Sequence, residues 1–259
     1  MKFKLIALAA VLAAAGSANA TVIDNGNITT TAGNGGLVFS IWDGANSYSR
    51  NLGLTINSFA SGLAATGNFN QSFAADATFT SFLGTADLAA LKWNVVATDN
   101  IGARRVLETF TAPKPLTGKT ADIIRTLAGG TSNFVTDLNT KLAAADSAIY
   151  AVGTQGYAGD AKKFGDNGAG LLNFSNAGTL ATNSFANGLS FMRIDAGATG
   201  IAASTYTTYL DGGNSVKLYI GADNSLTIAA VPEPESFAML LAGLGLMGAI
   251  ARRRNKKSA

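Results

Sequence analysis

Alternating apolar and polar positions predict short β-strands along much of the chain. Residues 37–42 and 48–56 lie on either side of D-G-A-N, a sequence whose Asp, Gly and Asn favour a turn. Residues 91–98 and 104–111 flank D-N-I-G in the same way. Each pair is therefore predicted to form an antiparallel hairpin.

A third hairpin is predicted from S-V-K-L-Y-I and S-L-T-I-A, which are separated by the turn sequence G-A-D-N. Because successive strand residues point to opposite faces, Ser215, Lys217 and Tyr219 should point away from the core. The inward face should carry the apolar residues of both strands, namely Val216, Leu218, Ile220, Leu226 and Ile228.

Helical periodicity is strongest in the middle of the chain. Thr120 is a plausible N-cap for a helix that ends at the Gly-Gly pair 129–130. A second helix would then begin at Thr131 or Ser132, and a short turn of helix is expected at 85–91. The second helix would bury a stripe of four residues, namely Phe134, Val135, Leu138 and Leu142.

These elements predict a mainly β fold class. The expected architecture is an antiparallel β-sandwich-like domain with a small helical insertion, followed by a single C-terminal hydrophobic helix. Residues 153–188 are rich in Gly and Asn without a sustained period, so loops and short strands are expected there.

The N-terminus has the pattern of a secretory signal peptide. M-K-F-K is followed by the apolar run L-I-A-L-A-A-V-L-A-A-A and by G-S-A-N-A. The small residues Ala18 and Ala20 mark the expected cleavage site, which makes Thr21 the first residue of the mature chain.

The body between the two chain ends is weakly charged and has no cysteine. The signal peptide contains two basic residues, and the C-terminal tail contains five. Without these, and without Glu233 and Glu235, 12 basic residues stand against 14 acidic ones, a formal net charge of −2. The high whole-chain pI therefore gives no support to a nucleic-acid partner. Stability must come from core burial and hydrogen bonds instead of disulfides.

The last apolar run, residues 237–251, is short for a membrane-spanning helix. Its 15 uncharged residues would cover about 22 Å as a helix, against a hydrocarbon core of about 30 Å. The basic residues after it favour a cytoplasmic C-terminus. Before it, Pro232 and Pro234 favour an extended backbone, so V-P-E-P-E-S should be accessible to a processing enzyme.

This order of V-P-E-P-E-S, a short Leu/Gly-rich apolar stretch and A-R-R-R-N-K-K resembles the PEP-CTERM sorting signal of Gram-negative bacteria. Pro232, Glu233 and Pro234 match its Pro-Glu-Pro. Its basic cluster matches three further residues that set membrane topology, namely Arg252, Arg253 and Arg254.

The resemblance implies a substrate of exosortase, which acts near the motif after transient inner-membrane anchoring. The protein would then reach the outer surface or the extracellular matrix of a host that makes exopolysaccharide and biofilm. The expected organisation is a signal peptide (1–20), a secreted body (21–230) and a sorting signal (231–259). The sorting signal comprises the motif 231–236, the hydrophobic helix 237–251 and the basic tail 252–259.

Catalysis is constrained because the chain has no His and no Cys, which excludes Ser-His and Cys-His mechanisms and the usual zinc sites. A paired-carboxylate hydrolase would have to use Glu108 or some of the thirteen aspartates of the body. Six of these aspartates precede Asn or Gly, where Asp commonly stabilises turns. These six are Asp24, Asp43, Asp99, Asp166, Asp211 and Asp223.

No cofactor is expected, and calcium is the one metal that the loops suggest. The best calcium loop holds Asp160, Asp166 and Asn167, but Lys162 and Lys163 lie inside it and the D-x-D-x-D-G spacing is absent. A solvated turn is the favoured interpretation.

Carbohydrate binding would require exposed aromatic residues beside polar groups. Tyr206 and Tyr209 should point to opposite faces of a strand, and Tyr219 should point outward. Trp42 and Trp93 lie in apolar strands and are expected in the core.

The sequence therefore favours a non-catalytic surface or matrix protein with a structural or adhesive role. One alternative is a carbohydrate-binding module, which would lose its retention on exopolysaccharide when Tyr206, Tyr209 or Tyr219 is replaced. The other is a carboxylate-dependent hydrolase.

Overall fold

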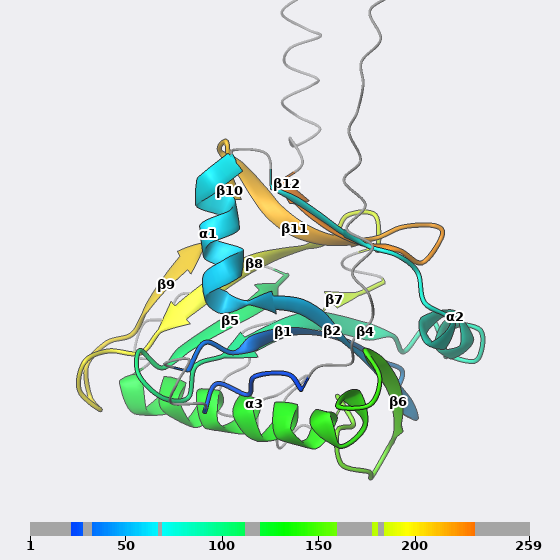
Figure 1. The fold of residues 1–259 in the computed structure, drawn as a ribbon, viewed down its shortest axis with the longest axis horizontal. Coiled ribbons are helices and arrows are strands. Elements are labelled where there is room, and N and C mark those ends of the chain that lie inside the picture. The colour runs from blue at the N-terminus through cyan, green and yellow to red at the C-terminus, as the bar shows by residue number, and fades with distance from the viewer. Residues whose placement is uncertain are drawn as a thin grey trace, which may run out of the picture.

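Figure 1 shows the computed structural model, which describes residues 22–27, 33–66, 69–111, 120–159, 178–180 and 184–230. The predicted signal peptide and the predicted sorting signal both lie outside these residues. The described part of the chain is mainly β, as predicted, and its strands pair in a twelve-stranded sheet.

The strands of this sheet are β1 Gly36–Trp42, β2 Asn46–Thr55, β3 Asn70–Phe73, β4 Lys92–Thr98, β5 Arg105–Phe110, β6 Ser147–Ala151, β7 Gly178–Thr179, β8 Leu189–Asp195, β9 Thr205–Thr208, β10 Leu210–Asp211, β11 Asn214–Ile220 and β12 Leu226–Ala230. Their main order is β3-β12-β11-β8-β5-β4-β1-β2-β6, and β10, β7 and β9 pair with β11, β4 and β8. The helices are α1 Ile56–Thr66, α2 Ala77–Leu83 and α3 Ala121–Leu142.

All three predicted hairpins are confirmed. β1 pairs with β2, β4 with β5 and β11 with β12, and each pair is antiparallel. In the last hairpin, the five residues predicted to face inward are all buried, namely Val216, Leu218, Ile220, Leu226 and Ile228. Local alternation and turn residues were enough to define these strands because each pairs with its neighbour in sequence.

One face of the sheet curls around the larger apolar core (Figure 1). Residues from opposite ends of the sheet meet there, including Tyr48 of β2 and Ile228 of β12. α1 contributes Phe59 and α2 contributes Phe79, whose ring stacks on that of Tyr48 at a centroid distance of 4.8 Å. Trp93 is fully buried in the same core, as predicted, and Trp42 is buried on the opposite face.

The opposite face of the sheet is covered by α3 (Figure 1). The prediction of two helices separated at Gly129 is wrong, because α3 is one helix of 22 residues. Each glycine inside a helix costs about 1 kcal/mol, whereas a buried Ile, Leu or Phe side chain contributes about 1.5–3 kcal/mol. The helix therefore continues past Gly129, because Ile124 and Leu127 before it and Phe134 after it are all buried against the sheet.

The short helix predicted at 85–91 is also wrong. α2 lies earlier, where the Asp76 side chain accepts a hydrogen bond from the Phe79 N–H at 2.6 Å and caps the helix. Residues 85–91 form turns instead, and the Asp87 side chain accepts the Ala89 N–H at 3.0 Å.

α1 replaces the predicted end of the second strand. Thr55 and Ser58 exchange hydrogen bonds between their backbone N–H groups and side-chain oxygens, at 2.8 and 3.2 Å. This reciprocal arrangement is a capping box with Ser in the third position, and it starts the helix at Ile56.

The sandwich form of the prediction is corrected to one curled sheet. Neighbouring strands are hydrogen-bonded along the whole path from β3 to β6, so the strands form one sheet. The two ends of this sheet enclose the larger core, whereas in a sandwich two separate sheets would do so. None of the helices in the described ranges combines the length and the apolar character needed to cross a bilayer. The predicted C-terminal hydrophobic helix lies outside those ranges.

Candidate functional site

The predicted sorting residues lie outside the described part of the chain, but the strand that leads to them is well defined. Ala230, the last described residue, ends β12 and lies opposite Val216 of β11. On its other side β12 pairs with β3. The sorting sequence thus follows directly from a strand held on both edges.

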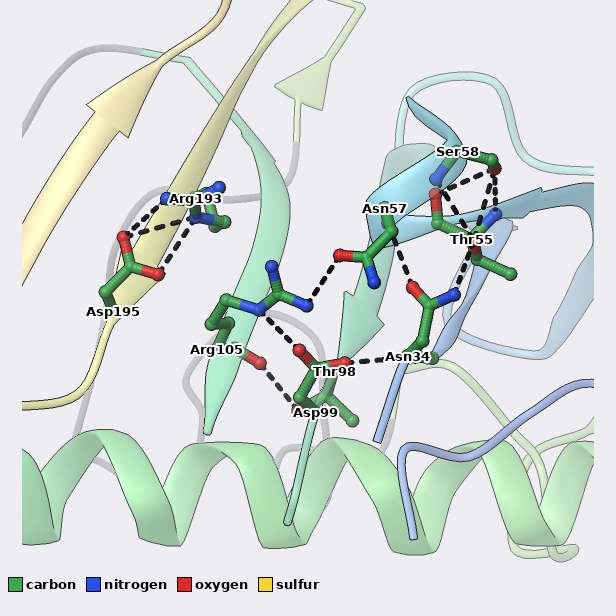
Figure 2. Close-up of polar contacts among 10 residues, drawn as sticks. Asn34, Thr55, Asn57, Ser58, Thr98, Asp99, Arg105, Arg193 and Asp195 are labelled. Carbon is green, nitrogen blue, oxygen red and sulfur yellow. Dashed lines mark hydrogen bonds and ion pairs between the residues drawn. The ribbon is translucent and has the colours of Figure 1, made fainter. Parts of the chain in front are cut away.

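A chain of polar contacts joins α1 to the β4–β5 hairpin (Figure 2). The guanidinium of Arg105 donates from Nε to Asp99 Oδ2 at 2.5 Å and from Nη2 to Asn57 Oδ1 at 2.9 Å. The other oxygen of Asp99 accepts the Gly35 N–H at 3.1 Å, and Asn34 Oδ1 accepts the Asn57 N–H at 2.9 Å. These contacts connect the start of α1, the loop before β1 and the β4–β5 hairpin.

A second arginine lies on the same face of the sheet. Arg193 binds Asp195 in a bidentate manner, with Nε to Oδ1 at 2.9 Å and Nη2 to Oδ2 at 3.0 Å. Asp195 of β8 lies opposite Arg105 of β5, which places both arginines at one end of these two strands (Figure 2). We call Asp99, Arg105, Arg193 and Asp195 the arginine cluster.

The electrostatics of the arginine cluster favour a structural role. Burial raises the pKa of Asp99, although the Gly35 N–H and the Arg105 charge oppose the rise. Burial acts to lower the pKa of Arg193, but the hydrogen bonds that its guanidinium donates to Asp195, together with the neighbouring Tyr209 hydroxyl, outweigh burial and raise the pKa. Each guanidinium is paired with one carboxylate, so the charges cancel within each pair.

The aspartates predicted to stabilise turns divide into two groups. Asp24, Asp43 and Asp223 accept backbone N–H groups two residues further along the chain, as predicted. The side chains of Asp99 and Asp211 make long-range contacts that the prediction missed. Asp211 accepts the Phe69 N–H at 2.6 Å, which ties β10 to the residue before β3.

The only glutamate of the body was also an acidic candidate. Glu108 is buried in β5, opposite Val96 of β4 and Met192 of β8. Within the described ranges, no group of three or more acidic side chains is placed to hold a metal ion. Asp166 and the predicted calcium loop with Asp160 and Asn167 lie outside those ranges.

The three tyrosines weighed for carbohydrate binding differ in exposure. Tyr206 on β9 is 42% exposed, whereas Tyr209 is only 8% exposed and packs its ring against Phe59 at 5.0 Å. This confirms that the two point to opposite sides. Tyr219 is half-buried on β11, and its ring covers Gly188.

A pocket of about 340 Å³ lies where β8 changes its hydrogen-bonding partner from β11 to β9. The backbone of Tyr209 connects β8 to β11 beside this pocket. Its N–H donates to the Phe191 carbonyl oxygen and its own carbonyl oxygen accepts the Val216 N–H, both at 3.0 Å. The described lining comprises Phe110, Thr111, Ser190, Phe191, Thr208, Tyr209, Ser215 and Lys217.

Sequence reasoning missed both the arginine cluster and this pocket. Every second residue of F-M-R-I-D lies on one face of β8, namely Phe191, Arg193 and Asp195. Their shared face could therefore have been predicted. The pairing of β8 with both β5 and β11 could not, because these strands are distant in sequence.

Comparison with known proteins identifies the C-terminus. The family model described as the PEP-CTERM protein-sorting motif matches residues 230–255, which include Pro232, Glu233, Pro234 and the three arginines from Arg252. The chain is thus of the class that carries a C-terminal membrane-sorting signal. It is a PEP-CTERM sorting domain-containing protein, and its motif implies export, membrane-anchored sorting in Gram-negative bacteria and processing by an exosortase. No curated protein and no solved structure matches the chain.

Proposed function

We propose that this chain is displayed on the outer surface or in the extracellular matrix of its host after an exosortase removes the sorting signal. The observation that carries the proposal is the sorting motif, which starts at the last residue of β12. In this scheme, Ala18 and Ala20 direct signal-peptide cleavage, Pro232 and Pro234 keep the processing site extended, and the inner membrane holds the chain only transiently.

The proposed role of the body is structural or adhesive, in association with exopolysaccharide or biofilm and without catalytic activity. The low charge of the body and the predominance of polar, uncharged surface residues support this role. The acidic side chains support a role without catalysis too. Asp99 and Asp195 each pair with an arginine, and Asp43 accepts the Asn46 N–H within its own turn.

Intact mass and C-terminal peptide sequencing of the surface-borne protein test the sorting step. The expected product lacks the tail from Arg252 to the C-terminus and begins at Thr21. A Pro232→Ala, Pro234→Ala double variant should accumulate unprocessed, because the motif and its extended backbone are lost. Surface-borne protein that retains Arg252 would contradict the proposal.

The role of the body is tested by deleting the gene from the host and measuring biofilm or floc formation. Restoring the full chain should restore normal biofilm or floc formation. A chain without residues 231–259 should not, because it would be secreted without being sorted to the surface. A deletion strain with normal biofilm and normal retention of exopolysaccharide would contradict a matrix role.

A carbohydrate-binding module is the second candidate, and the exposed Tyr206 favours it. Replacing Tyr206 by Ala tests stacking on the exposed ring without disturbing the core. Replacing Tyr209 by Ala would remove a buried ring instead, so a loss of binding there would report on folding. A carboxylate-dependent hydrolase is the least favoured candidate, and release of reducing ends from the host polysaccharide would be its signature.

A further inference from the structure

Three neighbouring strands place an aromatic ring, a hydroxyl group and an ammonium group in one row. Phe110 of β5 lies opposite Ser190 of β8, and Ser190 lies opposite Lys217 of β11. Adjacent strands are about 4.8 Å apart, so the row is about 10 Å long. All three residues line the pocket where β8 changes partners.

The row lies on the face of the sheet opposite the larger core. Leu189 and Phe191 flank Ser190 and belong to that core, as do Val216 and Leu218, which flank Lys217. Because strand residues alternate between faces, Ser190 and Lys217 must point to the other side. Phe110 packs there beside α3 and is 8% exposed, so only a small part of its side chain is accessible from the pocket.

Hydroxyl groups make up most of the polar lining. Thr208 lies opposite Met192, which belongs to the cluster under α3, so Thr208 shares the face of Ser190. Ser215 is two residues from Lys217 and shares its face too. Thr111 follows Phe110 and completes the serine and threonine hydroxyls in the lining.

Lys217 provides the charge of the pocket. It is the only charged residue in the described lining, and no carboxylate of the described chain forms an ion pair with it. An ammonium group beside hydroxyls favours a ligand that carries both an anion and several hydroxyl groups. The volume lies at the lower end of the range for small-molecule sites, which suits one sugar ring.

We propose that this pocket binds the acidic sugar units of a polysaccharide, with a uronic acid carboxylate on Lys217 and ring hydroxyls on Ser190, Thr208 and Ser215. The accessible part of Phe110 would contact an apolar part of the sugar ring. The inference rests on the proposed association of the body with exopolysaccharide and adds the chemical class that it recognises. A single phosphate ion fits less well, because phosphate sites usually combine an arginine or several backbone N–H groups with the cation.

The probe is sodium glucuronate, added to the full chain produced by an exporting host and kept in a zwitterionic detergent without a sugar headgroup. Glucose and acetate serve as the matched neutral and acidic controls. Backbone amide chemical shifts report the site, and glucuronate should move the signals of Ser190, Thr208, Ser215 and Lys217 with a dissociation constant on the order of 1 mM. Glucose and acetate should each bind more weakly.

Two variants of Lys217 separate charge from folding. Lys217→Gln removes the charge but keeps a polar side chain, and it should weaken glucuronate binding about tenfold. Lys217→Arg keeps the charge and should stay within about threefold of the unchanged protein. Both variants should unfold at the temperature of the unchanged protein, since Lys217 is only partly buried and its side chain is not part of the larger core.

The proposal is overturned if glucuronate at up to about 50 mM moves no signals of the pocket, if Lys217→Gln binds it unchanged, or if acetate matches it. Any of these results, obtained while the surface-borne protein is still processed and still retained by the host polysaccharide, removes the site and leaves the proposed function standing. Glucuronate binding that depends on Lys217, in a protein that is not retained by the matrix, would instead remove the proposed function.

Discussion

Ala230 of β12 lies directly opposite Val216 of β11, and the matched sorting motif begins at Ala230 itself. β12 is also paired with β3, where Ala229 lies opposite Asn70. The strand nearest the sorting signal is thus an interior strand, and its Leu226 and Ile228 side chains belong to the larger core. Cleavage at or after Val231 would leave every residue of this strand in place.

We therefore predict that the body is as stable after processing as before it. A chain ending at Ala230 should unfold at the same urea concentration as the full chain. Ile228→Ala, which removes a fully buried side chain from β12, should cost about 2–5 kcal/mol. Thr227→Ala on the half-buried side of the strand should cost less than about 1 kcal/mol. A large loss of stability in the chain ending at Ala230 would show that the sorting region belongs to the folded body.

The two aspartates of the arginine cluster should differ strongly in their effect on stability. Asp99 is fully buried and pairs with Arg105, so Asp99→Ala leaves a partly buried guanidinium and the Gly35 N–H without their acceptor. We expect a loss of about 3–5 kcal/mol in the free energy of unfolding. Asp195→Ala removes a more exposed pair and should cost less than about 1 kcal/mol. Equal losses in chemical denaturation would contradict this view of the cluster.

Asp43 should make a pH-dependent contribution to stability. Partial burial works against its charge, but the N–H groups of Asn46, Ala45 and Asp87 outweigh burial and lower the pKa of Asp43 below 3.8. A carboxylate whose pKa is lower in the folded state contributes fully above its unfolded pKa, and the contribution is lost as the pH falls through the folded pKa. At neutral pH, Asp43→Ala should cost about 1 kcal/mol, and Asp43→Asn should cost less because it keeps one acceptor oxygen.

The measurement is urea denaturation of the three proteins at several pH values. The gap between the unchanged protein and Asp43→Asn should close as the pH falls below 3.8 and through the lowered pKa of the folded Asp43 carboxyl, where that carboxyl is protonated. A gap that stays constant from neutral to acidic pH would exclude a role for the charge.

How far the sequence predicts this molecule depends on how local each feature is. The hairpin of β11 and β12 is local, and the alternation of Val216 and Leu218 was enough to define its inward face. Asp99 was correctly placed at a turn and its ion pair with Arg105 lies within the β4–β5 hairpin, but its bond to Gly35 depends on tertiary structure. The row from Phe110 to Lys217 is less local still, because it requires β8 to lie between β5 and β11.

The continuity of α3 gives a last prediction, because it places Gly129 inside a helix. A Cβ atom at Gly129 would meet only Asn100 Oδ1, at an ordinary contact distance of 3.6 Å. Gly129→Ala should therefore stabilise the protein by about 0.5–1 kcal/mol, since alanine has the higher helix propensity. In a domain of this size the midpoint of thermal unfolding should rise by about 1–4 °C.

Gly26→Ala provides the matched comparison for Gly129→Ala. Gly26 has a φ angle of +77°, and its Cβ would lie 2.0 Å from the Thr98 carbonyl oxygen, so alanine should destabilise the protein there. If the two glycines were simply flexible positions, both substitutions would shift the midpoint in the same direction. Opposite shifts in thermal unfolding are expected, because one glycine fills a helical position that any residue can take and the other fills a position that only glycine fits. A lowered midpoint for Gly129→Ala would instead support the two-helix arrangement predicted from the Gly-Gly pair.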